Sequence, residues 1–168
     1  KNTGNGWQKV AALNSKRWGF AQTFTPEGDV WVTGGSIGDD INVRSTEIYD
    51  EDADTWKFGP ELPVTAFDHA FLQLDGSNGT YLLLGGDDDS RKNYQYDWFT
   101  SEWTYLADFQ IPRRGLECFI ADYLDEESIL CAGGYDYSAQ ISTGVLQMEG
   151  ANATDSWKLG PQIPRSIY

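Results

Sequence analysis

Three Gly-Gly pairs recur at a nearly fixed spacing along the 168 residues of the chain. They are Gly34-Gly35, Gly85-Gly86 and Gly133-Gly134, and each pair ends a run of apolar residues. A tryptophan follows each pair, at Trp56, Trp103 and Trp157. A period of about fifty residues indicates one supersecondary unit that is repeated, so the fold is predicted from that unit.

Each repeat divides into four short runs that have the composition of β-strands. In the first repeat they cover residues 19–25, 30–33, 45–49 and 55–58, and turn residues separate them. No stretch of about a dozen residues places apolar side chains at helical spacing. We therefore predict an all-β protein made of four-stranded antiparallel sheets, which are the blades of a β-propeller.

The other two repeats follow the same plan. Strands are predicted over residues 70–74, 80–84, 93–99 and 103–106, and then over 116–122, 129–132, 144–148 and 157–159. Residues Trp7 to Ala11 are predicted to form the outer strand of a preceding blade. The predicted boundaries are 1–18 for that strand and its connection, 19–63 for blade 1, 64–112 for blade 2, and 113–168 for blade 3 with a connection onward.

The repeated residues are expected to have structural roles in these blades. A Gly-Gly pair suits a crowded place where a side chain would clash or where the backbone needs a positive φ. The tryptophan of each repeat is expected to reach the next blade and to bury a large area there.

In the first two repeats an apolar strand, Gly-Gly, a variable loop, Tyr-Asp, Trp and Pro follow one another, as in Tyr49-Asp50, Trp56 and Pro63 of the first. This order resembles the kelch repeat, and the third repeat departs from it where Met148-Glu149 replaces Tyr-Asp. The resemblance covers nearly the whole chain. It implies a kelch-type propeller segment with three complete blades plus one outer strand.

Three blades are too few for a closed ring, because propellers have about four to eight. Two explanations stay open for this chain. Further blades belong to the same longer chain, or a second copy completes the ring. An open stack of three blades would expose large apolar faces at both ends.

The kelch resemblance places the loops after each Gly-Gly and the connections between blades on one face, which is the recognition face of kelch proteins. The predicted partner-binding residues on it are Asp39, Asp40, Arg44, Asp87, Asp88, Asp89, Arg91, Arg113, Arg114, Tyr135, Asp136 and Tyr137. The net charge of −14 argues against nucleic acid and favours a basic protein partner. The clustered carboxylates could also bind Ca²⁺, although no EF-hand spacing is present. No apolar run is long enough to span a membrane.

Asn78 and Asn152 each begin an N-glycosylation sequon and fall in predicted turns between strands. Both positions would let a glycan project into solvent. The sequons therefore indicate an extracellular or secreted protein, the alternative being two chance matches in a cytosolic one.

Cys118 and Cys131 fall on the first two strands of the third repeat. If their turn centres on Leu124-Asp125, the two cysteines face each other, and a disulfide fits an oxidising compartment. If it centres on Glu126-Glu127, the pairing fails. The alternative is two buried thiols that act as small apolar side chains.

No catalytic set is evident, and we expect neither a cofactor nor a bound metal. His69, the single histidine, is interpreted as a structural residue. The expected function is a non-enzymatic extracellular scaffold or protein-interaction module. Two alternatives remain: an intracellular kelch adaptor that recognises ubiquitin-ligase substrates or binds actin, and part of a galactose-oxidase-like copper enzyme with ligands elsewhere.

Overall fold

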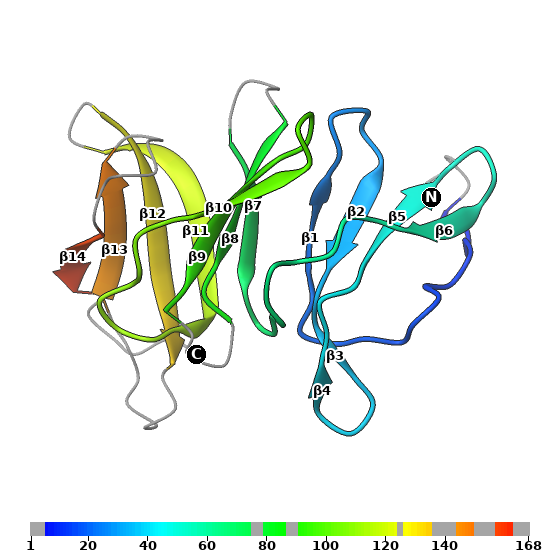
Figure 1. Cartoon of the computed structure of the whole chain (residues 1–168), viewed down its shortest axis with the longest axis horizontal. Helices are drawn as coiled ribbons and strands as arrows, with labels where there is room; N and C mark the ends of the chain where they lie inside the picture. Colours follow the sequence, from blue (N-terminus) through cyan, green and yellow to red (C-terminus); the bar gives the residue numbers. More distant parts are fainter. Residues whose placement is uncertain are drawn as a thin grey trace.

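The computed structural model (Figure 1) describes residues 6–74, 79–86, 91–123, 126–135, 144–149 and 157–162. These residues form three four-stranded antiparallel sheets that stand side by side in sequence order. No helix occurs within the described ranges. The predicted all-β architecture of propeller blades is confirmed.

The strands of each blade follow one another across the sheet. Blade 1 has β1 (Ala21–Phe24), β2 (Val30–Thr33), β5 (Thr46–Asp50) and β6 (Thr55–Phe58). Blade 2 has β7 (Ala70–Gln73), β8 (Thr80–Leu84), β9 (Asn93–Asp97) and β10 (Glu102–Tyr105). Blade 3 has β11 (Arg114–Tyr123), β12 (Glu126–Tyr135), β13 (Gly144–Glu149) and β14 (Lys158–Gln162).

Blades 1 and 2 are joined by an aromatic core around Trp31 of β2. Trp31 is fully buried, and its ring meets those of Phe71 and Tyr81 edge-on at centroid distances of 5.1 and 5.0 Å. Tyr96 and Trp98 of blade 2 contact the same indole at 5.8 and 5.2 Å. Such edge-on contacts add to the large apolar area that each ring removes from water.

Blades 2 and 3 share a second core, which holds the two cysteines. Tyr123 pairs with Glu126 and Cys118 lies opposite Cys131, so of the two registers left open by the sequence the structure has the one that brings the cysteines together. Their sulfur atoms form a disulfide, and both residues are buried. The disulfide therefore links the two strands of blade 3 that carry its contact with blade 2.

The Gly-Gly pairs lie where one blade meets the connection to the next. A Cβ on Gly34 would lie 2.5 Å from the carbonyl oxygen of Ala66, and one on Gly85 would lie 2.5 Å from that of Arg113. Both glycines have positive φ, at 59° and 64°. The expectation of crowding and positive φ is therefore confirmed at these positions.

Each repeated tryptophan contacts the segment that precedes its own blade, so the prediction that it contacts the next blade is wrong. The indole Nε1 of Trp103 donates to the carbonyl oxygen of Glu61, in the connection before its own blade, over 3.0 Å. Trp56 and Trp157 donate likewise to Ala11 and Ala107 over 3.0 and 3.2 Å. Trp103 lies opposite Tyr96 on one face of blade 2, and Tyr96 contacts Trp31 of blade 1. The alternation of side chains along the strand therefore directs Trp103 toward the preceding blade.

Two other departures concern the first blade. Residues 8–13 form no strand, and this segment instead contacts blade 1, where Ala11 donates its main-chain N–H to Asp54 over 2.8 Å. A β-strand in this segment would need a neighbouring strand that pairs with its main-chain N–H and C=O groups. The loop after Gly34-Gly35, for which the sequence predicted no strands, contains a two-stranded hairpin of β3 (Ser36–Ile37) and β4 (Ile41–Asn42).

Candidate interaction face

The β3–β4 hairpin, the connections that lead into the three blades and the end of β12 meet at one end of the blades. There they enclose an open hollow of about 380 Å³, which we call the three-blade hollow. All three blades contribute to it. Among the described residues, those that line it are Trp18, Asp40, Asn42, Phe67, Asp68, Arg114 and Tyr135.

A chain of main-chain hydrogen bonds crosses the blades and passes through Asp68, one of the residues that line the hollow. Asp68 donates its N–H to the carbonyl of Gly19 over 2.8 Å, and Gly115 donates to the carbonyl of Asp68 over 2.7 Å. Gly19 and Asp68 lie two residues before β1 and β7, and Gly115 is the second residue of β11; all three have positive φ, at 60°, 51° and 67° in chain order. They therefore occupy equivalent positions in the three repeats.

Asp68 differs from its two counterparts because it carries a side chain into this position. The carboxyl group is partly buried, and desolvation raises its pKa above the ordinary value. The Tyr135 hydroxyl, which donates to Oδ2 over 3.3 Å, and the positive charge of Arg114 both act against that rise. The charged form of Asp68 is thus only partly compensated within the hollow.

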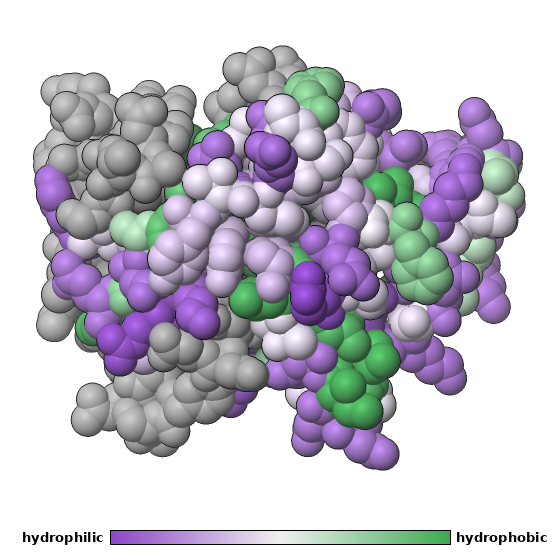
Figure 2. All heavy atoms as spheres, viewed as in Figure 1, coloured by the Kyte–Doolittle hydropathy of each residue, from purple (hydrophilic) through white to green (hydrophobic). Residues whose placement is uncertain are grey.

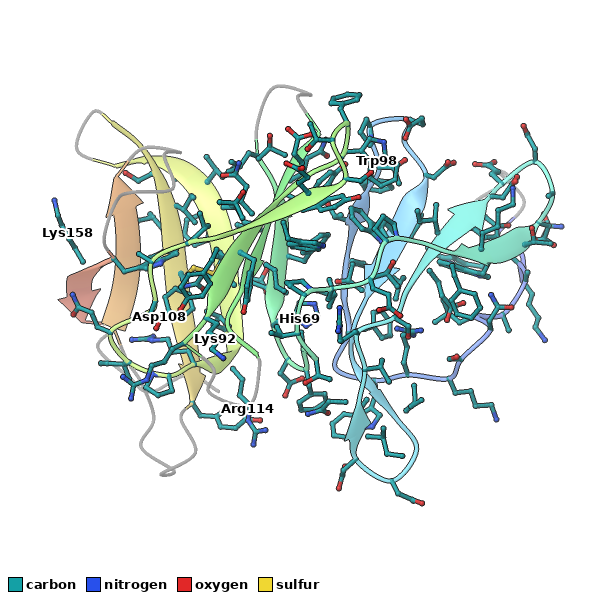
Figure 3. All side chains as sticks on the ribbon, in the orientation of Figure 1. His69, Lys92, Trp98, Asp108, Arg114 and Lys158 are labelled. Carbon is teal, nitrogen blue, oxygen red and sulfur yellow. A yellow bond between two sulfur atoms is a disulfide. The ribbon has the colours of Figure 1, made fainter. Side chains whose placement is uncertain are left out.

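Arg114 lies against two aromatic rings. Its guanidinium carbon is 4.8 Å from the ring centroid of Tyr135 and 6.0 Å from that of Phe67. Phe67 in turn meets Trp18 edge-on, with 4.5 Å between centroids. Figure 3 shows Arg114 at the end of the blades where the β3–β4 hairpin lies. The rings hold the guanidinium in place as one wall of the hollow.

The rim of this face is apolar in part. Trp18 is 54% exposed, and Ile41 at the β3–β4 hairpin is 59% exposed. Figure 2 shows strongly hydrophobic atoms gathered over this hairpin. Exposed large apolar side chains beside a charged hollow are typical of surfaces that bind other proteins.

Of the residues predicted to bind a partner, the structure brings Asp40, Arg114 and Tyr135 together, because all three line the hollow. Asp39 and Arg91 are exposed, and Arg44 donates its Nε to the carbonyl of Leu62 over 2.6 Å. Asp87, Asp88, Asp89, Asp136 and Tyr137 lie outside the described residues, as do the sequon residues Asn78 and Asn152.

Arg113 is a correction to the predicted partner-binding set. It is 1% exposed, and its Nη1 donates to the carbonyl of Gly133 over 2.8 Å. Arg17 makes the matching contact with Gly34 in blade 1 over 2.7 Å. These arginines satisfy carbonyls at the Gly-Gly pairs, so their position in the connections has a structural cause.

Four lining residues were not singled out from the sequence, namely Trp18, Asn42, Phe67 and Asp68. Alignment of the repeats at the start of their first strands could have revealed Asp68, because Gly19 and Gly115 stand at the equivalent positions. Asn42 belongs to the β3–β4 hairpin, where the sequence predicted no strands.

His69 points into the interior between blades 1 and 2 (Figure 3). Its Nε2 lies 3.0 Å from the Thr33 hydroxyl, and burial lowers the pKa of the imidazole to about 3. The histidine is therefore neutral at physiological pH, which fits the structural role expected of it. The described residues include no group of three or more His, Cys, Asp or Glu side chains placed to hold a metal ion.

Comparisons with known proteins agree with this architecture. A family model described as the kelch motif matches residues 21–63, which include all four strands of blade 1. The solved structure of YjhT, a kelch-type propeller, superimposes with a TM-score of 0.75 at 13% sequence identity. The match covers 95% of this chain but 56% of that one. No curated protein matches the sequence. Within the described ranges, no helix has the length and hydropathy needed to cross a membrane.

Proposed function

This chain is built of kelch-type propeller blades, and on that premise we propose that it is a protein-interaction module whose partner binds the face with the three-blade hollow. The observation that carries the proposal is the composition of the hollow. Three repeats contribute to one concave surface that combines aromatic rings, two carboxylates and a guanidinium. Concave surfaces of this composition suit the recognition of a specific partner.

The partner is expected to be basic. The chain carries a net charge of −14, and among the described residues that line the hollow two carboxylates, Asp40 and Asp68, stand against one guanidinium, Arg114. Complementary charge speeds encounter between proteins and disfavours acidic competitors.

Further blades, from a longer chain or from a second copy, are expected to cover the outer faces of blades 1 and 3. Phe24 and Phe58 lie on the face of blade 1 opposite Trp31 and are 58% and 69% exposed. Phe119 on the outer face of blade 3 is 47% exposed. The 56% coverage of YjhT supports the same idea. Light scattering of this chain distinguishes a second copy, which gives a dimer, from blades of a longer chain.

An extracellular, non-enzymatic role is part of the proposal. The Cys118–Cys131 disulfide supports it, because disulfides persist in oxidising compartments. The sequons at Asn78 and Asn152 support it as well. Mass spectrometry of the protein from its native source should find glycans on both asparagines, and unmodified asparagines with reduced cysteines would argue for the intracellular alternative.

Photo-crosslinking tests the interaction face. A photoreactive phenylalanine analogue at Ile41, on the rim of the hollow, should crosslink a protein partner under native conditions. The same analogue at Tyr105, which is 53% exposed on the outermost strand of blade 2, is the matched control. Equal crosslinking at both positions, or none at Ile41, would count against the proposal.

A further inference from the structure

We propose that the three-blade hollow is a subsite for one lysine or arginine side chain of the partner, with the cationic head at Asp68 and the hydrocarbon stem on the ring of Trp18. The inference rests on the proposed function for the nature of the partner. It goes further because it assigns the side chain that is recognised and the residues that recognise it.

The fold does not need a side chain at the position of Asp68. Gly19 and Gly115 occupy the equivalent positions, and the three residues form one chain of main-chain hydrogen bonds. A non-glycine residue with positive φ is strained, and two of the three repeats avoid that strain with glycine. Strained residues that the structure tolerates are found preferentially at functional sites.

The Asp68 carboxylate can accept further hydrogen bonds. Asp68 is partly shielded from water, and the donor recorded at Oδ2, the Tyr135 hydroxyl, lies at the long distance of 3.3 Å. A carboxylate offers about four acceptor sites on its two oxygens. An ammonium or guanidinium group that enters the hollow would therefore add a charge-assisted hydrogen bond, which is stronger than the bond from the neutral phenol.

The charged and polar side chains around Asp68 decide which ligand charge the hollow favours. Asp40 adds a second carboxylate from the turn of the β3–β4 hairpin, and Asn42 adds an amide. Arg114 supplies one positive charge, and its guanidinium lies over the Tyr135 ring at 4.8 Å. The described lining residues carry two carboxylates against one guanidinium, so they favour a cation over an anion.

Trp18 lines the same hollow as Asp68. Its ring is 54% exposed and is held edge-on by Phe67 at 4.5 Å. Lysine and arginine bury their hydrocarbon stems along apolar surfaces while the charged head stays at a polar site. An exposed, fixed ring that shares a hollow with a carboxylate offers both contacts to one side chain.

Calorimetric titration with a hexalysine peptide, blocked at both ends, tests the subsite on the whole chain. Asp68→Asn, which retains the shape and tolerates positive φ, should weaken hexalysine binding about tenfold through loss of one charge-assisted contact. Glu102→Gln removes the same charge from exposed β10 and should weaken it less than about twofold, because that effect is only long-range. Equal effects of the two variants would overturn the subsite, as would tighter binding of hexaglutamate.

Two additions keep the test decisive. Asp68→Gly reproduces the residue of the sister repeats, so it replaces Asp68→Asn if the latter loses its circular dichroism spectrum. Trp18→Ala should also weaken hexalysine binding, whereas fully acetylated hexalysine should bind none of the proteins. If Ile41 still crosslinks a partner while hexalysine ignores Asp68, the subsite fails and the interaction face stands. If hexalysine depends on Asp68 but Ile41 crosslinks nothing, the protein-interaction role fails instead.

Discussion

Trp103 donates its indole N–H to the main-chain carbonyl of Glu61 over 3.0 Å, and so it fastens blade 2 to the connection that leaves blade 1. The same bond recurs in the other repeats. Trp103→Phe should cost about 1 kcal/mol of unfolding free energy through the lost hydrogen bond, and Trp103→Ala about 3 kcal/mol through lost packing as well. Urea titration measures both. Trp7→Ala is the control, because Trp7 is 91% exposed, and a loss as large as that of Trp103→Ala would refute this role.

Glu47 is the centre of a buried ionic contact between blade 1 and the N-terminal segment. It accepts from Arg17 over 2.8 Å and from the main-chain N–H of Asn14, and the side chains of Arg17 and Glu47 are fully buried. Glu47→Ala should destabilise the protein by about 3 to 5 kcal/mol, because it leaves the Arg17 charge buried without its partner. Glu61→Gln, in the exposed pair with Arg44, should change the unfolding midpoint little. Similar shifts for the two variants would contradict this reading.

The disulfide closes a hairpin in the core between blades 2 and 3. Reduction should destabilise the wild type by about 2 to 4 kcal/mol, because it releases the unfolded chain from the cross-link. The double variant Cys118→Ala/Cys131→Ala should be less stable than the oxidised wild type and insensitive to reductant. Thermal unfolding with and without dithiothreitol checks both statements. A wild type whose melting temperature ignores reductant would show that the bond contributes nothing.

His69 predicts a pH dependence of stability. Its pKa is about 3 in the folded protein, against 6.5 for the free side chain. Between these values the unfolded chain binds a proton that the folded protein does not, so stability is complete above pH 6.5 and falls as the pH drops toward 3. The slope from this residue is at most about 1.4 kcal/mol per pH unit. His69→Gln should flatten the curve across that window, and parallel curves for the two proteins would rule out a buried neutral histidine.

The architecture was predictable because it is encoded in a repeated local pattern. The Gly-Gly pairs of the first two repeats predicted the ends of β2 and β8, whereas β12 continues through Gly133-Gly134. Crowding at Gly34 and Gly85 explains why no other residue fits there. The register of Cys118 and Cys131 was one of two that the sequence allowed for their hairpin, and the structure decides between them. Features that depend on one stretch of chain were thus accessible to sequence reasoning.

The site was predictable only in part, because its composition depends on contacts between repeats. Arg113 and Arg114 are neighbours of the same type, yet one is buried against Gly133 and the other lines the hollow. No local pattern separates them. The direction of the Trp103 contact depends likewise on which blade face meets its neighbour.

The central claim is that the partner binds at the three-blade hollow, and quantitative capture of one partner by matched variants tests it most directly. The protein crosslinked through Ile41 would be purified and its affinity measured for the wild type, Trp18→Ala and Phe99→Ala. Both variants remove one exposed aromatic ring, Trp18 at the hollow and Phe99 in the turn at the opposite end of blade 2. We predict that Trp18→Ala weakens binding at least about tenfold and that Phe99→Ala leaves it unchanged. Unchanged binding by Trp18→Ala, or an equal loss with Phe99→Ala, would contradict the account.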